Sequence, residues 1–183
     1  MNELSRIISV DASLNSRTFK KGTIIQQAGE YNSFAYYVKK GLLRSYKIDE
    51  KGKEHVFTFA SEGWIVADIE SQEFDQPTEL FIDSLEDTEA IIFDRSSFKV
   101  GNFTENQLKE NAHLLARHIA TLQKRVILLM SAPAEKRYLD FIETYPELIN
   151  RVPQHMIASY LGITPQALST IRGKMAKKGN SFY

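Results

Sequence analysis

Cysteine is absent from all 183 residues of the sequence. This absence excludes disulfides, thiolate-bound zinc, iron–sulfur clusters, cysteine nucleophiles and thiol-based redox sensing, and it fits a reducing compartment. Histidine is scarce as well, since only four are present, no two form a His-x-His pair, and only His55 lies in the part of the chain with β character. A metal site needs several such ligands close together, so we expect no metal.

Long apolar runs are also missing. No stretch approaches the roughly 20 residues that cross a bilayer, and no basic segment followed by an apolar run begins the chain. We therefore expect a protein without a signal peptide or membrane segment, located in the cytoplasm. The sequence contains no glycine-rich phosphate loop, nucleophile elbow or paired metal motif either, so we expect no catalytic residues, no cofactor and no enzymatic activity.

The net charge is zero, but the charged residues are unevenly distributed. Residues 151–183 contain no aspartate or glutamate and five basic residues, which are Arg151, Arg172, Lys174, Lys177 and Lys178. The first 150 residues consequently carry 18 of the 23 basic and all 23 acidic residues, a net charge of −5. A basic end on an acidic body suits binding to the phosphate backbone of nucleic acid, although a charged tail is also ordinary solvated surface.

The region 18–94 shows the rhythm of about eight short strands separated by turns. Residues 42–48 and 55–59 flank a turn of sequence Glu-Lys-Gly-Lys, which predicts an antiparallel hairpin. Further strands are expected at 19–25, 34–39, 64–67, 79–84 and 89–93. Short strands at this spacing predict a small antiparallel β-roll of jelly-roll type, and with the helices that follow they place the chain in the α+β class.

Residues 104–130 contain neither glycine nor proline and predict one helix of about seven turns. Leucine recurs there at every seventh position, with mostly β-branched residues four positions later, as in a parallel two-stranded coiled coil. The expected dimer interface consists of Leu108, Ala112, Leu115, Ile119, Leu122, Val126 and Leu129. A helix packed on its own domain also needs an apolar stripe, and Leu114, Ile127 and Leu128 widen the stripe as such a helix would.

A twenty-residue pattern that starts at Gln154 is the most specific motif in the chain. Apolar residues stand at its positions 4, 8, 10, 15 and 18, with Ala158 at position 5 and Gly162 at position 9. A small residue at 158 lets two helices cross closely, and Gly162 can adopt the positive φ of a tight turn. The pattern predicts a helix-turn-helix, in which Thr164 caps the second helix and Pro165 is its first residue. A helical hairpin that only packs a core is the alternative.

In a DNA-binding helix-turn-helix the second helix enters the major groove, so residues 165–177 are expected to contact DNA. Gln166 can pair with adenine through two hydrogen bonds, while Arg172 and Lys174 suit phosphates and would set affinity and salt dependence. The complete set of residues expected to contact DNA is Thr164, Pro165, Gln166, Ser169, Thr170, Arg172 and Lys174.

The order of these parts, a β-roll, a long helix and a helix-turn-helix, resembles the CRP/FNR family of bacterial transcription regulators over nearly the whole chain. The strings that carry the resemblance, besides the helix-turn-helix, are KKGTII (20–25), GE (29–30), YYVKKGLLRSY (36–46) and DEKGKEHVFTFASEGWIV (49–66). The resemblance implies a homodimer that binds a two-fold related site on double-stranded DNA near promoters. RNA polymerase and an unidentified small-molecule effector are further candidate partners. The expected parts are a cyclic-nucleotide-binding-like roll (1–103), a dimerisation helix (104–131) and a DNA-binding domain (132–183).

One segment departs from the pattern of this family. Its cyclic-nucleotide binders carry a phosphate cassette, with a Gly-Glu-Leu motif followed by Arg-Ser or Arg-Thr and alanine. In the matching residues 68–84, Glu70 is assigned to the acidic position, the glycine is missing, and Thr78-Glu79 replaces the arginine pair. No arginine or lysine lies between Lys53 and Arg95. Burying a phosphodiester without a cation is costly, so we expect no binding of cyclic AMP or cyclic GMP.

Another small molecule could still bind the roll. The candidate residues for its pocket, which core packing and solvated surface also explain, are Trp64, Asp68, Glu70, Phe81, Arg117 and Thr121. Family members often continue past the recognition helix into a two-stranded wing, whereas this sequence ends at Tyr183, so either the wing is short or absent or the sequence is truncated. Two other classes stay open, a dimeric interaction or ligand-sensing module that binds no DNA and, with less support, a cupin-like enzyme.

Overall fold

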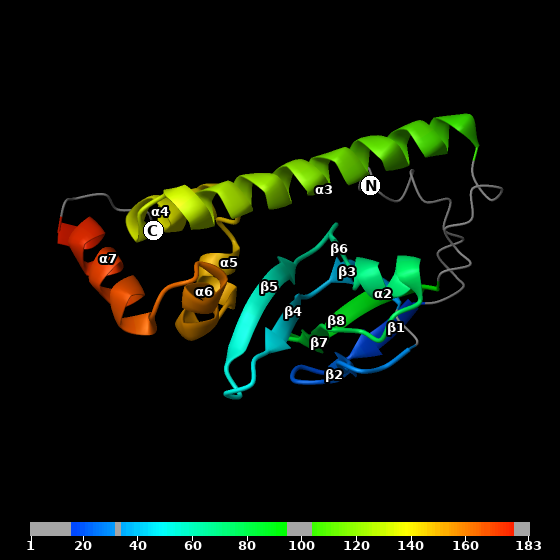
Figure 1. The fold of residues 1–183 in the computed structure, drawn as a ribbon, viewed down its shortest axis with the longest axis horizontal. Coiled ribbons are helices and arrows are strands. Elements are labelled where there is room, and N and C mark those ends of the chain that lie inside the picture. The colour runs from blue at the N-terminus through cyan, green and yellow to red at the C-terminus, as the bar shows by residue number, and fades with distance from the viewer. Residues whose placement is uncertain (1–15, 32–33, 95–103, 178–183) are drawn as a thin grey trace. The chain divides into compact units, whose positions relative to one another are not determined.

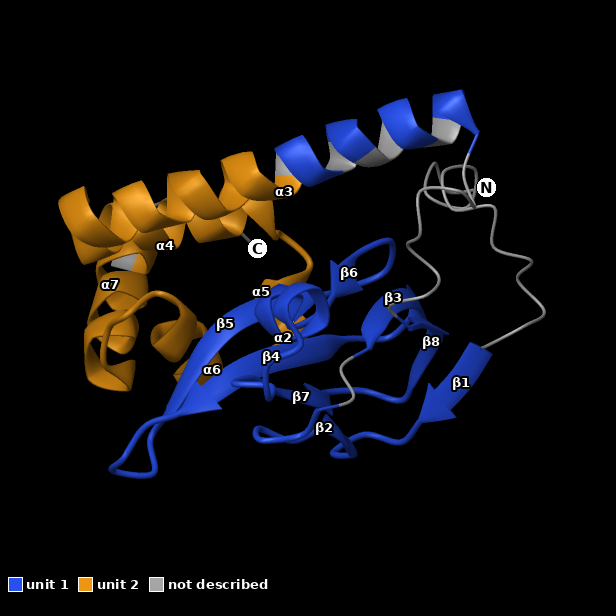
Figure 2. Cartoon of the chain, turned by 45° about the vertical axis from the view of Figure 1, so that its right-hand side comes forward, with its two compact units in different colours: residues 1–116 blue, residues 117–183 orange. Residues whose placement is uncertain are grey.

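The computed structural model describes residues 16–31, 34–94 and 104–177. The chain divides into two compact units, residues 1–116 and 117–183, which Figure 2 distinguishes by colour. The strands all belong to the first unit and precede the long helix α3 in the chain, as Figure 1 shows. None of the helices within the described ranges has the length and apolarity needed to cross a bilayer.

The first unit contains two four-stranded antiparallel sheets. The first sheet consists, in spatial order, of β1 (Ser16–Phe19), β8 (Thr88–Phe93), β3 (Ala35–Lys40) and β6 (Ile65–Val66). The second consists, in spatial order, of β2 (Ile24–Gln26), β7 (Phe81–Ser84), β4 (Leu43–Ile48) and β5 (Glu54–Ala60). The chain passes repeatedly from one sheet to the other, which makes the unit a roll rather than a meander. The predicted antiparallel β-roll and the α+β class are therefore confirmed.

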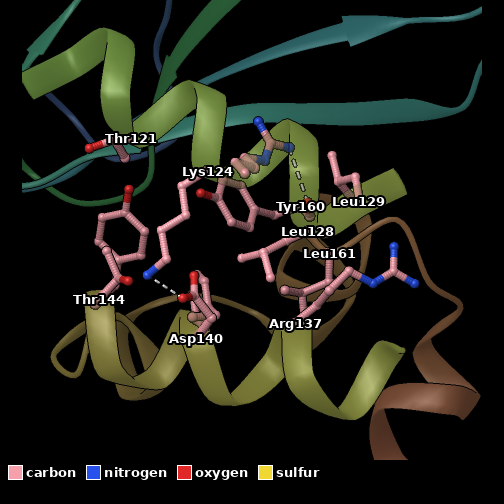
Figure 3. A pocket seen from close by; sticks show the side chains of 12 residues that line it. Thr121, Lys124, Leu128, Leu129, Arg137, Asp140, Thr144, Tyr160 and Leu161 are labelled. Carbon is pink, nitrogen blue, oxygen red and sulfur yellow. Dashed lines mark hydrogen bonds and ion pairs between the residues drawn. The ribbon is translucent and has the colours of Figure 1, made fainter. Parts of the chain in front are cut away.

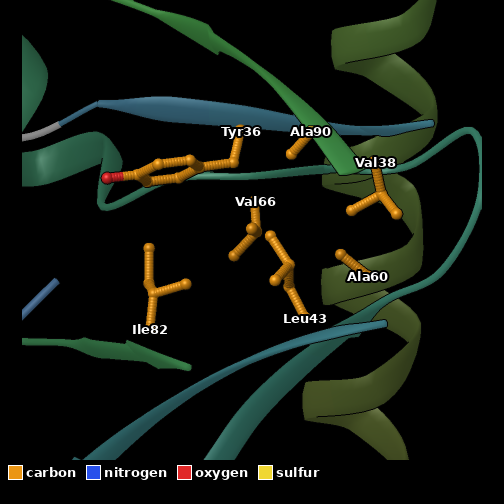
Figure 4. Packing of buried hydrophobic residues seen from close by; sticks show 7 residues of the cluster. All are labelled: Tyr36, Val38, Leu43, Ala60, Val66, Ile82 and Ala90. Carbon is orange, nitrogen blue, oxygen red and sulfur yellow. The ribbon is translucent and has the colours of Figure 1, made fainter. Parts of the chain in front are cut away.

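Apolar side chains from both sheets form the core of the roll. The cluster, drawn in Figure 4, comprises Tyr36, Val38, Leu43, Ala60, Val66, Ile82 and Ala90. Strand β4 contributes Leu43 to this core, and because side chains alternate along a strand, Arg44 points to the opposite face. The predicted hairpin is present, since β4 pairs antiparallel with β5 and Gly52 in the turn has a φ of 76°.

A short helix that the sequence pattern does not predict, α2 (Ile69–Phe74), lies between β6 and β7. Asp68 caps its N-terminus by accepting a hydrogen bond from the Ser71 N–H, and Asp75 ends it in the left-handed conformation at φ 56°. A helix of six residues is too short to show a periodic pattern, so its caps are the only local signal.

The predicted long helix is confirmed as α3 (Glu105–Ser131), which begins directly after Thr104. The helices that follow are α4 (Ala134–Thr144), α5 (Leu148–Arg151), α6 (Gln154–Tyr160) and α7 (Pro165–Lys177). In the second unit the residues that are almost fully buried are Phe141, Leu148, Ile157, Ala158, Leu161 and Leu168. They join α4, α5, α6 and α7 into one small helical core.

Candidate nucleic-acid interface

The turn between α6 and α7 has the geometry of a Schellman motif. The Ile163 N–H donates to the Ala158 carbonyl and the Gly162 N–H to the Ser159 carbonyl, each at 3.0 Å. Gly162 has a φ of 64°, as predicted, which other residues adopt only with strain. A Cβ atom at this position would lie 3.3 Å from Leu129 Cδ2, so the turn also packs closely against α3. The turn is therefore fixed both by its backbone and by its surroundings.

The start of α7 is defined by the two residues that the sequence indicates. Thr164 Oγ1 accepts a hydrogen bond from the Ala167 N–H at 3.2 Å, which is a side-chain N-cap. Pro165 is the first helical residue, where its missing N–H costs nothing. Both predictions are confirmed, and α7 begins at a defined point with its N-terminal backbone exposed.

The two helices pack through the residues of the twenty-residue pattern. Ile157, Ala158 and Leu161 are buried on the side of α6, and Leu168 and Ile171 on the side of α7. At helical spacing, burial of positions 168, 171 and 175 turns positions 166, 169, 170 and 173 to the opposite side. The core therefore decides which face of α7 is presented to solvent.

This outer face of α7 carries polar side chains and no acidic residue. Gln166, Ser169 and Lys174 are exposed, and Thr170 is exposed too, although its hydroxyl donates to the Gln166 carbonyl at 3.0 Å. The Thr170 oxygen can then act only as an acceptor. Arg172 is half-buried at the edge of the face. The side chain of Lys177 is not described, and Lys178 lies outside the described residues.

The unit that carries this face has a net positive charge. Residues 117–183 contain ten basic and four acidic residues, a net charge of +6. The N-terminus of α7 adds the partial positive charge of its unbonded N–H groups. A polar face of this sign attracts a polyanion before any specific contact is made.

Arg125 on α3 holds α6 in place, an interaction that the sequence analysis missed. Its Nη2 donates to the Tyr160 carbonyl at 3.0 Å, and its guanidinium lies 4.0 Å from the centre of the Tyr160 ring. Burial lowers the pKa of Arg125, while the nearby Tyr160 and Tyr145 act in the opposite direction. Tyr160 in turn packs against Phe141, with ring centres 5.4 Å apart. No spacing in the sequence links positions 125 and 160.

A cavity of about 140 Å³ lies beside this contact, between α3, α4 and α6. Figure 3 shows its lining, in which Lys124 from α3 reaches Asp140 on α4 and forms an ion pair. Leu128 lies across the same space. These contacts couple the C-terminal half of α3 to the helix-turn-helix within the second unit.

The predicted dimer stripe on α3 is exposed. Leu115, Ile119 and Val126 are 58%, 56% and 53% exposed, and Leu122 and Leu129 are about 40% exposed. Ala112 is exposed as well, and only Leu108 is half-buried. Ile127, which widens the stripe, is exposed, whereas the side chain of Leu114 is not described. Most of the stripe is therefore exposed within the described residues, although Leu129 also lies beside the Gly162 turn.

The residues proposed for an effector pocket belong to both units, with Trp64, Asp68, Glu70 and Phe81 in the first and Arg117 and Thr121 in the second. Trp64 packs against the core of the roll. Phe81 stacks on Tyr46 at 5.3 Å, on the face of β7 opposite to the core residue Ile82. Thr121 lines the cavity of the second unit, and the side chain of Arg117 is not described.

The acidic residues of the segment 68–84 differ in exposure. Glu70 is exposed on α2, whereas Asp68 is only 4% exposed and binds backbone N–H groups. The buried acids of this segment are Asp68, which the N-cap of α2 turns inward, and Asp83. Across the described parts of the chain, no three Asp, Glu, His or Cys side chains come together as metal ligands.

Comparisons with known proteins agree with this architecture. Residues 16–100 match the cyclic nucleotide-binding domain family. The anaerobic regulatory protein of Haemophilus influenzae is 23% identical over 192 residues, which cover 98% of this chain and 72% of that protein. A protein of the same name from Aggregatibacter actinomycetemcomitans is also 23% identical, over 195 residues with the same coverage.

Solved structures match nearly the whole fold. FixK2 from Bradyrhizobium japonicum has a TM-score of 0.76 at 20% identity and covers 90% of this chain and 85% of its own. A CooA mutant from Carboxydothermus hydrogenoformans has a TM-score of 0.73 at 20% identity, covering 98% and 86%. A CRP/FNR-family transcriptional regulator from Thermus thermophilus has a TM-score of 0.70 at 20% identity, covering 90% and 87%.

Proposed function

We propose that this chain, which has the fold of the CRP/FNR transcriptional regulators over nearly its whole length, is a sequence-specific DNA-binding regulator that acts as a homodimer. The resemblance to this family that the sequence indicates is confirmed by the family match of residues 16–100 and by the solved structures. The regulators in these comparisons are not enzymes, and we assign no catalytic residue to this chain.

The outer face of α7 is the observation that carries the proposal. It is a polar surface without acidic residues on a helix whose start and orientation are fixed by the Thr164 cap and the Gly162 turn. A helix presented in this way fits the major groove, with its first turns nearest the base edges. A helical hairpin that served only as a packing unit would gain nothing from this face.

Individual roles follow from position on the helix. Gln166 and Ser169 lie on the first two turns and read bases, with the Gln166 amide matching the donor and acceptor of adenine. Thr170 accepts a hydrogen bond from a base amino group, because its own proton is used within the helix. Arg172 and Lys174 lie at the edges of the face and bind phosphates, and Thr164 and Pro165 bring the helix N-terminus close to the backbone.

A second copy of the chain covers the exposed stripe of α3 in this proposal. The leucine heptads with β-branched partners favour two parallel strands. Two copies related by a two-fold axis place two α7 helices on one side of DNA, about one helical turn of roughly 34 Å apart. The proposed parts are then the roll (1–103), the dimerisation helix (104–131) and the DNA-binding domain (132–183), with RNA polymerase as a partner at the promoter.

The roll acts without cyclic AMP in this proposal. The segment between Lys53 and Arg95 holds no basic residue, and its buried acid Asp68 would oppose a phosphate. An effector of the roll, where one exists, would be a small molecule without a phosphodiester.

Selection of bound DNA from a random duplex library, at several salt concentrations, tests the proposal. The expected result is a two-fold symmetric motif whose affinity falls steeply with salt, since several phosphate contacts release counterions. Binding to DNA without sequence preference would mean that α7 attracts DNA only through its charge and reads no bases. No retention of DNA at any salt concentration would favour a dimeric module that does not bind DNA.

A further inference from the structure

Asp68 makes more contacts than an N-cap requires. Its Oδ1 accepts a hydrogen bond from the Ser71 N–H at 3.3 Å, which is the capping bond of α2. Its Oδ2 accepts two more, from the Glu79 N–H at 2.9 Å and the Leu80 N–H at 3.1 Å. The two oxygens therefore join the start of α2 to a segment eleven residues further along the chain.

The segment that carries these two N–H groups, residues 75–80, is held at a second point by Thr78. The Thr78 N–H donates to the Glu30 carbonyl at 2.8 Å, and its hydroxyl donates to the Gln27 carbonyl at 2.6 Å. Thr78 is itself only 3% exposed. One side of the segment is thus fixed to the loop before β3, and the other side is fixed to α2 by Asp68 and by the Ser71 hydroxyl, which donates to the Gln76 carbonyl at 2.8 Å.

A carboxylate is required for this arrangement. Three backbone N–H groups that converge on one point form a small anion-binding nest, and leaving them unbonded in a buried position is costly. Serine, threonine or asparagine would cap α2 equally well, but each offers a single acceptor oxygen. Only aspartate supplies one oxygen to the helix and a second, charged oxygen to the pair at Glu79 and Leu80.

We propose that Asp68 is a built-in anion, whose carboxylate fills the nest formed by the N–H groups of Ser71, Glu79 and Leu80 and holds the segment 75–80 closed against α2. The closed form of this part of the roll then needs no external anion, because the chain carries the anion in its own sequence. This inference concerns the first unit alone and goes beyond DNA binding, so its test does not depend on whether the protein binds DNA.

Hydrogen exchange at individual amides of the full-length protein, measured without DNA, tests the proposal. In Asp68→Ala the amides of Glu79 and Leu80 should exchange at least about tenfold faster than in the parent, because they lose their acceptor. Sodium formate or acetate should restore their protection, because a small carboxylate can enter the vacated position. Glu70→Ala, which removes an exposed carboxylate from the same helix, should change neither the protection nor the response to formate.

Several outcomes would overturn the proposal. Unchanged protection of Glu79 and Leu80 in Asp68→Ala would mean that the carboxylate does not close the segment. The Glu79 and Leu80 amides could also lose protection in Asp68→Ala without regaining it in formate, acetate or inorganic phosphate. Asp68 would then act only as the N-cap of α2. The Glu79 and Leu80 amides of the parent protein could instead gain protection when phosphate is added. The nest would then bind external anions, and Asp68 would not fill it.

A second variant covers the case in which Asp68→Ala does not fold. Asp68→Asn keeps the shape of the side chain but has one acceptor oxygen, so protection should survive at Ser71 or at the pair Glu79 and Leu80, but not at both. Full protection at all three amides in Asp68→Asn would contradict the need for a charged second oxygen. The matched control is Glu70→Gln, the same chemical change on an exposed position of α2.

Discussion

Charged and polar groups are used in opposite ways by the roll and by the helix-turn-helix. In the roll, Arg44 is 3% exposed and forms a two-bond pair with Asp83, with Nε to Oδ1 at 3.0 Å and Nη2 to Oδ2 at 2.5 Å. Its guanidinium also lies 3.9 Å from the centre of the Tyr46 ring and donates to Glu54. On α7, by contrast, Gln166 and Lys174 extend into solvent.

The difference shows which groups serve the chain itself and which are available to a partner. Burial alone would lower the pKa of Arg44, but hydrogen bonds and charge from Asp83 and Glu54 outweigh it, and the pKa is raised. Arg44 thus offsets its desolvation within the roll, as Asp68 does with backbone N–H groups. The exposed face of α7 keeps its hydrogen-bonding capacity for another molecule, which is what recognition requires.

The largest expected effect comes from breaking the internal pair of the roll. Asp83→Ala leaves the Arg44 guanidinium buried without its main partner, which should lower the free energy of unfolding of the first unit by about 3 kcal/mol. Unfolding in urea measures this loss of free energy. The control is Lys47→Ala, which removes an exposed ion pair with Glu79 and should cost less than about 1 kcal/mol. Equal losses in both variants would mean that burial of the pair is irrelevant.

A charge in the exposed stripe should separate the two copies of the chain. Ile119→Asp places two carboxylates face to face in the proposed dimer, so sedimentation should show a monomer, and affinity for a two-fold DNA site should fall by about a hundredfold as avidity is lost. Ala120→Asp introduces the same charge one residue away, outside the stripe, and should remain dimeric. A dimeric Ile119→Asp protein would place the interface elsewhere.

The reading face of α7 should respond to loss of a single amide. Gln166→Ala should weaken binding to the selected site by about 1–3 kcal/mol and relax the preference at one base position, because a two-bond contact to that base is lost. Gln154→Ala, the same change at the exposed start of α6, should bind as the parent does. Fluorescence anisotropy on the selected duplex and its single-base variants measures both. If affinity fell equally for all duplexes, Gln166 would contact the DNA phosphate backbone and not a base.

The smallest expected effect comes from Gly173, which lies on the same face as Gln166. An added Cβ would meet no atom within 4 Å in the free chain, so Gly173→Ala should stabilise the second unit by about 0.5–1 kcal/mol through helix propensity. The added methyl group would face the DNA groove, so affinity should fall slightly while stability rises. Thermal unfolding and anisotropy measure the two effects. If Gly173→Ala raised both the stability of the second unit and its affinity for DNA, this part of α7 would lie away from the DNA.

Short-range patterns in the sequence determined the hairpin of β4 and β5, the long helix α3 and the helix-turn-helix with its Gly162 turn and Thr164 cap. Each depends on residues a few positions apart, through a positive φ, a capping hydroxyl or an apolar period, so neighbours along the chain are enough to specify it.

Contacts between distant positions were decided only by the tertiary structure. Arg44 meets Asp83 across 39 residues, Arg125 meets Tyr160 across 35, and Asp68 meets Glu79 across eleven. Strand order in the two sheets and the outward orientation of Phe81 belong to the same group. In each case the side chain needs a partner to offset its burial, and which partner comes within reach depends on how the whole chain packs rather than on any repeating pattern in it.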